Sequence, residues 1–299
     1  MRVPDDERGA ADVYIPEGPG WGPNEEALYN AVSQGDVMPP RSFLDTARTV
    51  QSHMHGELSV LYRSQVSVVF VDVPAAQVRI ARRNSQAFQL FMAAIVNHPS
   101  LLASYSFDQI LRNGRRRLTR DSRALRRRED YMLSSFEPAV HRLLADRPNL
   151  AEAKTIRVLF NLGTAHTRIS HELDRRGYIT RRIFAQRPLV FDHYWQAQRA
   201  AILGRPIDDT LLARAILTNC FYRVVLRDRL SVDMRAVHAM CRTVMGGLSV
   251  NDIEHVLRSY WKGTPGENRG EVLARIFSQE LGIALPTTDS ELDRFVSAL

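Results

Sequence analysis

The chain has 299 residues, of which 24% are charged and 44% hydrophobic, and its formal net charge is +7. This composition is typical of a globular protein and excludes wholesale disorder. No window of about 18 residues is apolar throughout, which excludes a membrane-spanning helix. The acidic residues 1–12 lack the apolar core of a signal peptide, so a soluble cytoplasmic protein is expected.

The first two thirds of the chain alternate between strand and helix patterns. Residues 65–73 form a nearly continuous β-branched run, typical of a strand buried on both faces. Strands are predicted at about 12–17, 66–72, 155–161 and 179–184. Helices are predicted at about 24–33, 41–64, from Pro74 to Pro99, 125–148 and 168–178. This alternation predicts an α/β fold with a central, mostly parallel sheet and helices on both faces.

After Pro188 the strand signal disappears, and helices are predicted at 208–226, 231–245, 249–261 and 270–281. The sequence therefore predicts two domains: an α/β core over residues 1–187 and a helical extension or small bundle over 188–299. The two cysteines, Cys220 and Cys241, match no metal or redox spacing. They are expected to be buried thiols.

The positive charge is concentrated in one segment, Arg112 to Arg128. Nine arginines against one acid, Asp121, give this segment a charge of +8, which leaves the rest of the chain near −1. Basicity is therefore local, and a global electrostatic argument for nucleic-acid binding fails. The segment is interpreted either as a solvated loop and helix start or as a phosphate-binding patch. It contains no aromatic residue that could stack on bases, so nucleic acid is not the favoured partner.

One candidate site follows the third predicted strand, at Gly163-Thr-Ala-His166. A histidine at the carboxyl end of a strand, beside a helix N-terminus, lies where open α/β sheets bind their ligands. Gly163 permits a tight turn, and the helix N-terminus favours an anion or a polarised oxygen. Thr164 and Thr167 are candidate binding residues or helix caps. His166 is either functional or a structural histidine hydrogen-bonded to the backbone.

Four features in this order resemble the Tiki/TraB/erythromycin-esterase/ChaN-like superfamily over about residues 12–186. Tyr14 to Glu17 is similar to its early strand ending in a glutamate, and Asp72 is a strand-end acid. Arg128-Glu-Asp-Tyr-Met132 resembles its R-D/N-x-x-M segment, and Gly163 to His166 its G-x-x-H motif. The resemblance implies an α/β sheet with a cleft at the strand ends and, in several branches, metal-dependent hydrolysis.

The resemblance implies a catalytic set of His166, Glu17, Arg128 and Asp72. His166 would be a general base or a metal ligand, Glu17 a second ligand to a divalent metal, and Arg128 an oxyanion donor. Arg128 could instead be a surface arginine, or pair with Glu17 for structural reasons. The superfamily also carries an earlier strand with a histidine, whereas the first histidine here is His53. Either the chain begins late or it has lost that half of the site.

Two functions are therefore kept open. The first is a metal-dependent, hydrolase-like protein, active or degenerate, that acts on a small-molecule or peptide substrate in a cleft at the strand ends. The second is a non-catalytic binding protein that uses Arg112 to Arg128 to contact nucleic acid or another protein. The helices at 231–245 and 249–261 resemble a helix-turn-helix only loosely, because neither is especially basic.

Overall fold

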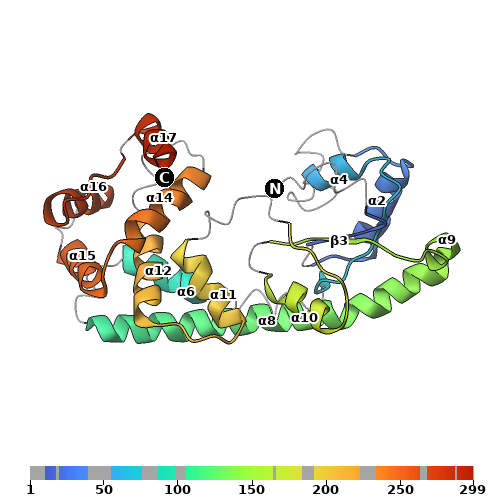
Figure 1. Cartoon of the computed structure of the whole chain (residues 1–299), viewed down its shortest axis with the longest axis horizontal. Helices are drawn as coiled ribbons and strands as arrows, with labels where there is room; N and C mark the ends of the chain where they lie inside the picture. Colours follow the sequence, from blue (N-terminus) through green and yellow to red (C-terminus); the bar gives the residue numbers. More distant parts are fainter. Residues whose placement is uncertain are drawn as a thin grey trace. The chain divides into compact units, whose positions relative to one another are not determined.

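The structure of the chain is a computed structural model (Figure 1). It describes residues 11–17, 20–39, 55–75, 87–97, 105–163, 166–183, 192–222, 234–262, 268–286 and 288–298. Parts of the predicted helices at 41–64 and 74–99 lie outside these residues, as do His53, Thr164 and Pro188.

The chain divides into two compact units, and neither is continuous in sequence. Unit 1 comprises residues 1–83 and 125–185, and unit 2 comprises residues 84–124 and 186–299. The sequence-based division assigned all of residues 1–187 to one core. In the structure, residues 84–124 instead cluster with the helical unit.

Unit 1 contains a parallel sheet of three short strands in the order β2-β1-β3 (Figure 1). The strands are β1 (Val13–Pro16), β2 (Ser67–Val68) and β3 (Val158–Asn161). The central strand β1 pairs in parallel with both neighbours, so that Val13 lies opposite Ser67 on one side and Val158 on the other. Because all three strands run in the same direction, their carboxyl ends meet at one edge of the sheet.

Side chains of β1 alternate between two groups of buried residues, as the period of a strand requires. Val13 and Ile15 pack with Met132 and Phe136, which belong to the long helix α8 (Phe107–Asp146). Tyr14 packs with residues of α2 (Pro23–Gln34) and α4 (His55–Leu61). Unit 1 also contains α9 (Pro148–Ala151) and α10 (Arg168–Arg175).

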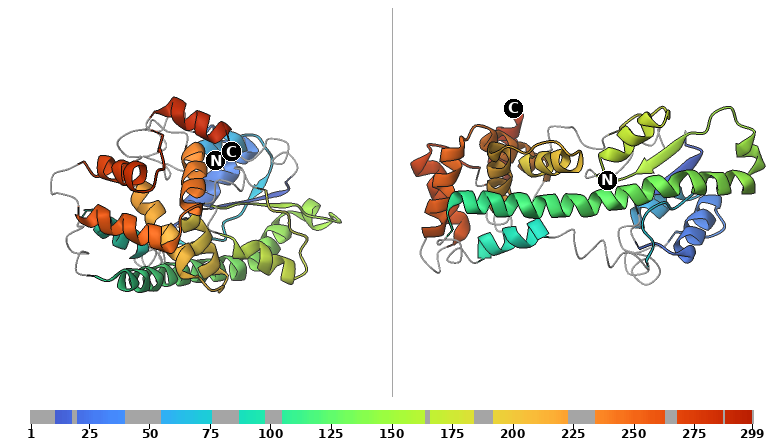
Figure 2. Two further views of the ribbon diagram at one scale, coloured as in Figure 1. Left: turned by 60° about the vertical axis from the view of Figure 1, so that its left-hand side comes forward. Right: turned by 90° about the horizontal axis from the view of Figure 1, so that it is seen from below.

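Helix α8 is the main departure from the sequence-based prediction (Figure 2). The arginine segment was interpreted as a loop and helix start, but it lies inside one 40-residue helix. Buried positions recur at helical spacing through the basic region, at Phe107, Ile110, Leu111, Gly114 and Leu118. Small and polar residues share this buried face, and they weakened the apolar pattern in the sequence.

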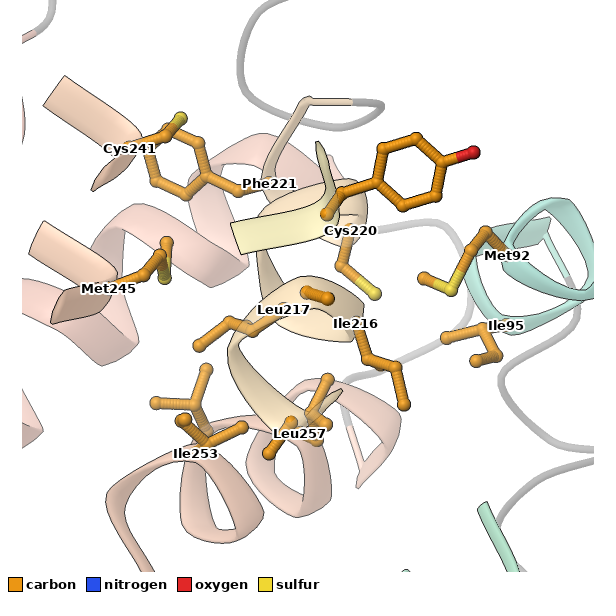
Figure 3. Close-up of a cluster of buried hydrophobic side chains, with 14 of the residues drawn as sticks. Met92, Ile95, Ile216, Leu217, Cys220, Phe221, Cys241, Met245, Ile253 and Leu257 are labelled. Atoms are coloured by element: carbon orange, nitrogen blue, oxygen red, sulfur yellow. The ribbon is translucent and has the colours of Figure 1, made fainter. Parts of the chain in front are cut away.

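Unit 2 is helical in its described residues and has a large apolar core (Figure 3). The core brings Met92 and Ile95 against Ile216, and its two cysteines, Cys220 and Cys241, are buried thiols as predicted, with no disulfide between them. Besides the first part of α8, unit 2 contains α6 (Ala87–Asn97), α11 (His193–Ile202), α12 (Asp209–Phe221), α14 (Met234–Gly246), α15 (Val250–Lys262), α16 (Arg269–Arg275), the π-helical turn η4 (Ile276–Glu280) and α17 (Asp289–Ser297).

The predicted α/β class holds in its coarse form, but helix predominates and the sheet is small. Residues 179–183, the described part of the fourth predicted strand, are not in a strand. Ile179 is fully exposed there, and Tyr178 packs edge-on against Phe136. Among the described residues, no neighbouring strand supplies backbone hydrogen bonds to this β-branched segment.

None of the described helices has the length and apolar character that crossing a bilayer requires.

Asp121, the one acid of the arginine segment, holds the first residues of α6 by hydrogen bonds. Its carboxylate accepts hydrogen bonds from the backbone N–H groups of Ala87 (2.9 Å) and Phe88 (2.8 Å). Replacement by alanine leaves both donors without this acceptor in a buried place, so Asp121→Ala should destabilise the protein by about 1–3 kcal/mol. Urea denaturation measures this, with the exposed Asp108→Ala on the same helix as the control. Equal losses from both variants would contradict the role of Asp121.

Candidate functional site

The carboxyl ends of the three strands bring together the residues predicted for the site. Glu17 directly follows β1, Asp72 lies four residues beyond β2, and Gly163 lies two residues beyond β3. His166 follows three residues later, just before α10. This edge is where parallel sheets expose the ends of their strands to a ligand.

Arg128 of α8 reaches this edge and binds two carboxylates. Its Nε donates to Asp72 Oδ1 at 2.8 Å, and its Nη2 donates to both Asp72 Oδ2 and Glu17 Oε1, the latter at 3.1 Å. Asp72 is fully buried, and its Oδ1 also accepts the backbone N–H of Val73. Arg128 is therefore a partly buried clamp between two strand ends, and its side chain is only 14% exposed.

The second oxygen of Glu17 faces the turn after β3. Glu17 Oε2 accepts the backbone N–H of Gly163. A Cβ atom at residue 163 would lie 2.8 Å from the same oxygen, closer than such a contact allows. A side chain at residue 163 would therefore displace the Glu17 carboxylate from this contact.

His166 is held between two carboxylates. Its Nε2 lies 3.2 Å from Glu17 Oε1, and its Nδ1 lies 3.6 Å from Glu129 Oε1. The imidazole side chain is only 1% exposed, whereas Glu17 is 29% exposed. Glu17 is therefore the more accessible member of the pair, and His166 lies behind it.

The charges at the site stabilise each other. Burial alone would raise the pKa of Glu17, but the hydrogen bond and charge of His166, with Arg128 and the Gly163 N–H, lower that pKa to about 2. Burial alone would lower the pKa of His166, but its contacts with Glu129 and Glu17 raise that pKa above its usual value of 6.5. The contact between the two side chains therefore favours the carboxylate form of Glu17 and the protonated form of His166.

Glu129 is the one member of this cluster that the sequence analysis missed. It is fully buried, and besides its contact with His166 its Oε1 accepts the backbone N–H of Arg168 at 3.4 Å. Its Oε2 is buried and has no hydrogen-bond partner in the structure. The signal was present in the sequence, because Glu129 shares helical spacing with the buried Met132, Leu133 and Phe136. An acid on an apolar helix face requires a polar partner.

The predicted binding residues on the turn have a mixed outcome. Gly163 contacts Glu17 as described, and Thr164 lies outside the described residues. Thr167 is the residue before α10, but its side chain makes no capping hydrogen bond. Its Oγ1 is buried and has no hydrogen-bond partner among the described residues.

The predicted metal ligands, His166 and Glu17, do not fit a divalent cation as they are arranged. Catalytic zinc sites usually provide three protein ligands with a neutral imidazole, whereas His166 and Glu17 are only two groups, they contact each other, and the surroundings of His166 favour its protonated form. Glu17 is further engaged by Arg128 and Gly163. The described residues contain no group of three or more His, Cys, Asp or Glu side chains that could hold a metal.

No family model matches the chain, and comparisons with curated proteins and with solved structures also found no match. The resemblance to the Tiki/TraB/erythromycin-esterase/ChaN-like superfamily therefore stays a hypothesis based on the site residues.

Removal of the Arg128 clamp should destabilise the protein strongly. Arg128→Met leaves Asp72 buried without its counter-charge, which costs about 3–5 kcal/mol. Arg175→Met is the matched control, because Arg175 is 80% exposed and pairs only at the surface with Glu172. Urea denaturation followed by Trp21 fluorescence, with Trp195 and Trp261 replaced by phenylalanine, reports on unit 1. Similar losses for the two variants would contradict the clamp.

The low pKa of Glu17 predicts an acid-dependent loss of stability. A pKa lowered from 4.5 to about 2 contributes about 3 kcal/mol, which is fully present above pH 4.5 and lost as the pH falls through 2. The difference in unfolding free energy between the wild type and Glu17→Gln should therefore shrink by about this amount over that interval. Urea titrations at a series of pH values measure it, and a constant difference would contradict the ion pair.

Proposed function

We infer that the chain is a hydrolase-like protein in which Glu17 and His166 form an acid–base pair at the carboxyl edge of the sheet. The observation that carries this proposal is the 3.2 Å approach of a partly exposed carboxylate and a buried imidazole that come from two different strand ends. Such pairs of coupled titratable groups are typical of catalytic sites. The proposal does not route any step through a metal, because neither group is free to bind one.

Glu17 is the residue that would meet the substrate, because it is the more exposed member of the pair. With a pKa near 2 it is a weak base at neutral pH, so it needs activation before it can accept a proton from water. Arg128 is the partner that a substrate could displace. An anionic group on the substrate would compete with Glu17 for Nη2 of Arg128, while Asp72 continues to hold Nε.

Exchange of this ion pair would raise the pKa of Glu17 when the substrate binds. Glu17 could then take a proton from a water molecule as the water oxygen attacks the scissile carbonyl, and later return that proton to the leaving group. The imidazolium of His166 and the guanidinium of Arg128 supply positive charge beside the oxyanion. The substrate class that fits is therefore an ester or amide, in a small molecule or a peptide, with an anionic group near the scissile bond.

This function is tested with two p-nitrophenyl esters, the neutral acetate and the glutarate monoester, which carries a carboxylate. The wild type should hydrolyse the glutarate monoester faster than the acetate, because only that ester can compete for Arg128. Glu17→Gln should lower kcat on the glutarate monoester by at least about 100-fold, since it removes the general base. Release of p-nitrophenol is followed by absorbance.

Glu152→Gln is the matched control, because Glu152 is an exposed acid of the same unit. This control should keep the activity of the wild type. Equal rates for the wild type and Glu17→Gln would exclude Glu17 as the base. A folded wild type that hydrolyses neither ester would count against the proposed substrate class and favour a non-catalytic protein.

A further inference from the structure

The two nitrogens of the His166 ring face carboxylates that differ in their other partners. On the Nε2 side, Glu17 Oε1 lies at 3.2 Å, and the charge of Glu17 is already offset by Arg128 and by the Gly163 N–H. On the Nδ1 side, Glu129 Oε1 lies at 3.6 Å, which is the distance of an ion pair rather than of a hydrogen bond. The ring is thus placed between a well-partnered carboxylate and the carboxylate of a residue in α8.

Glu129 has few other groups to offset its charge. Its side chain is fully buried, and its Oε2 has no hydrogen-bond partner among the described residues. Its Oε1 accepts the backbone N–H of Arg168 at the long distance of 3.4 Å. The guanidinium of Arg168 also acts on Glu129, but it pairs directly with Asp130 at 2.6 Å. Because charges interact more strongly in a buried place of low dielectric, Glu129 depends on the imidazole of His166 more than Glu17 does.

We propose that Glu129 is a positioning residue, which keeps a proton on Nδ1 of His166 and so makes Nε2 the nitrogen that exchanges protons on the side of Glu17. A carboxylate beside Nδ1–H fixes the tautomer and orientation of an imidazole in the Ser-His-Asp arrangement. A proton that leaves Nε2 passes to Glu17 Oε1, so an O–H bond replaces the N–H bond and the two opposite charges cancel. The catalytic use of this arrangement rests on the proposed function, in which the Nε2 side of the ring faces the oxyanion.

The charges around the ring predict what removal of Glu129 would do. Burial lowers the pKa of His166, the contacts with Glu129 and Glu17 raise it, and the charge of Arg128 lowers it, with a net rise. Loss of the Glu129 charge should therefore lower the pKa of His166. It would also leave Glu17 as the carboxylate beside the ring, so the proton of the neutral imidazole should move to Nε2.

A merely structural role of Glu129 makes a different prediction. As an acceptor for the Arg168 N–H, Glu129 could be replaced by glutamine, which has the same length and a carbonyl oxygen that accepts hydrogen bonds. Aspartate would be too short for this contact. A role that depends on charge reverses the order, because aspartate keeps the carboxylate and glutamine does not. Glu129→Gln and Glu129→Asp therefore separate the two roles.

The test is ¹⁵N NMR of the whole chain labelled in its histidine side chains, with the signals of His166 assigned from their absence in His166→Gln. At a pH above its titration midpoint, His166 of the wild type should carry its remaining proton on Nδ1. Glu129→Gln should move the midpoint to lower pH and the proton to Nε2, whereas Glu129→Asp should resemble the wild type. Asp146→Asn removes an exposed acid at the end of α8 and, as the control, should change neither readout.

The same variants are assayed on the glutarate monoester. Glu129→Gln should lower kcat at least about tenfold and Glu129→Asp less, and the limb of the pH–rate profile that reports His166 should move to lower pH in Glu129→Gln. The proposal is overturned if the neutral ring of the wild type carries its proton on Nε2. It is also overturned if Glu129→Gln keeps the midpoint and tautomer of the wild type, or the kcat of an active wild type. A wild type that hydrolyses neither ester overturns the proposed hydrolysis alone, since the NMR result does not depend on activity.

Discussion

The guanidinium of Arg128 is the interaction on which the site of unit 1 depends. It joins the carboxylate after β1 to the buried carboxylate beyond β2. Through Glu17 the same connection extends to the Gly163 turn and to His166 after β3. Three strand ends and helix α8 are thus connected through the side chains of Asp72, Arg128, Glu17 and His166. Because Asp72 is fully buried, removal of the Arg128 guanidinium would leave the charge of its carboxylate uncompensated.

The same contacts set the chemistry that this edge could perform. Each partner that stabilises Glu17 as a carboxylate also weakens it as a base, because hydrogen bonds to the charged form lower the pKa. A catalytic role therefore requires a substrate that exchanges one of these partners, and Arg128 is the partner with a second anchor on Asp72. If the proposed function holds, stability and activity are opposed here.

Helix α8 contributes residues to both units. In unit 2, Asp121 turns inward to accept hydrogen bonds from backbone N–H groups, whereas Arg112, Arg116 and Arg123 are exposed. In unit 1, Arg128 and Glu129 turn toward the site, and Met132 continues the same face into the apolar core. A run of arginines therefore contains three different environments, which its composition alone does not distinguish.

The sequence by itself determined the strand–turn–helix at Gly163 to His166, the early strand that ends at Glu17, and the helical character after Pro188. These are local patterns, so the chain within ten or twenty residues is enough to predict them. The tertiary structure alone decided that residues 179–183 stay outside the sheet, that the arginine segment lies within a single helix, and that Glu129 holds His166. Each of these depends on a partner distant in sequence: a strand that could pair, a core that buries one helix face, or an imidazole that meets a buried acid. Local propensity contains no information about such partners, because burial and charge pairing are settled only when the elements pack.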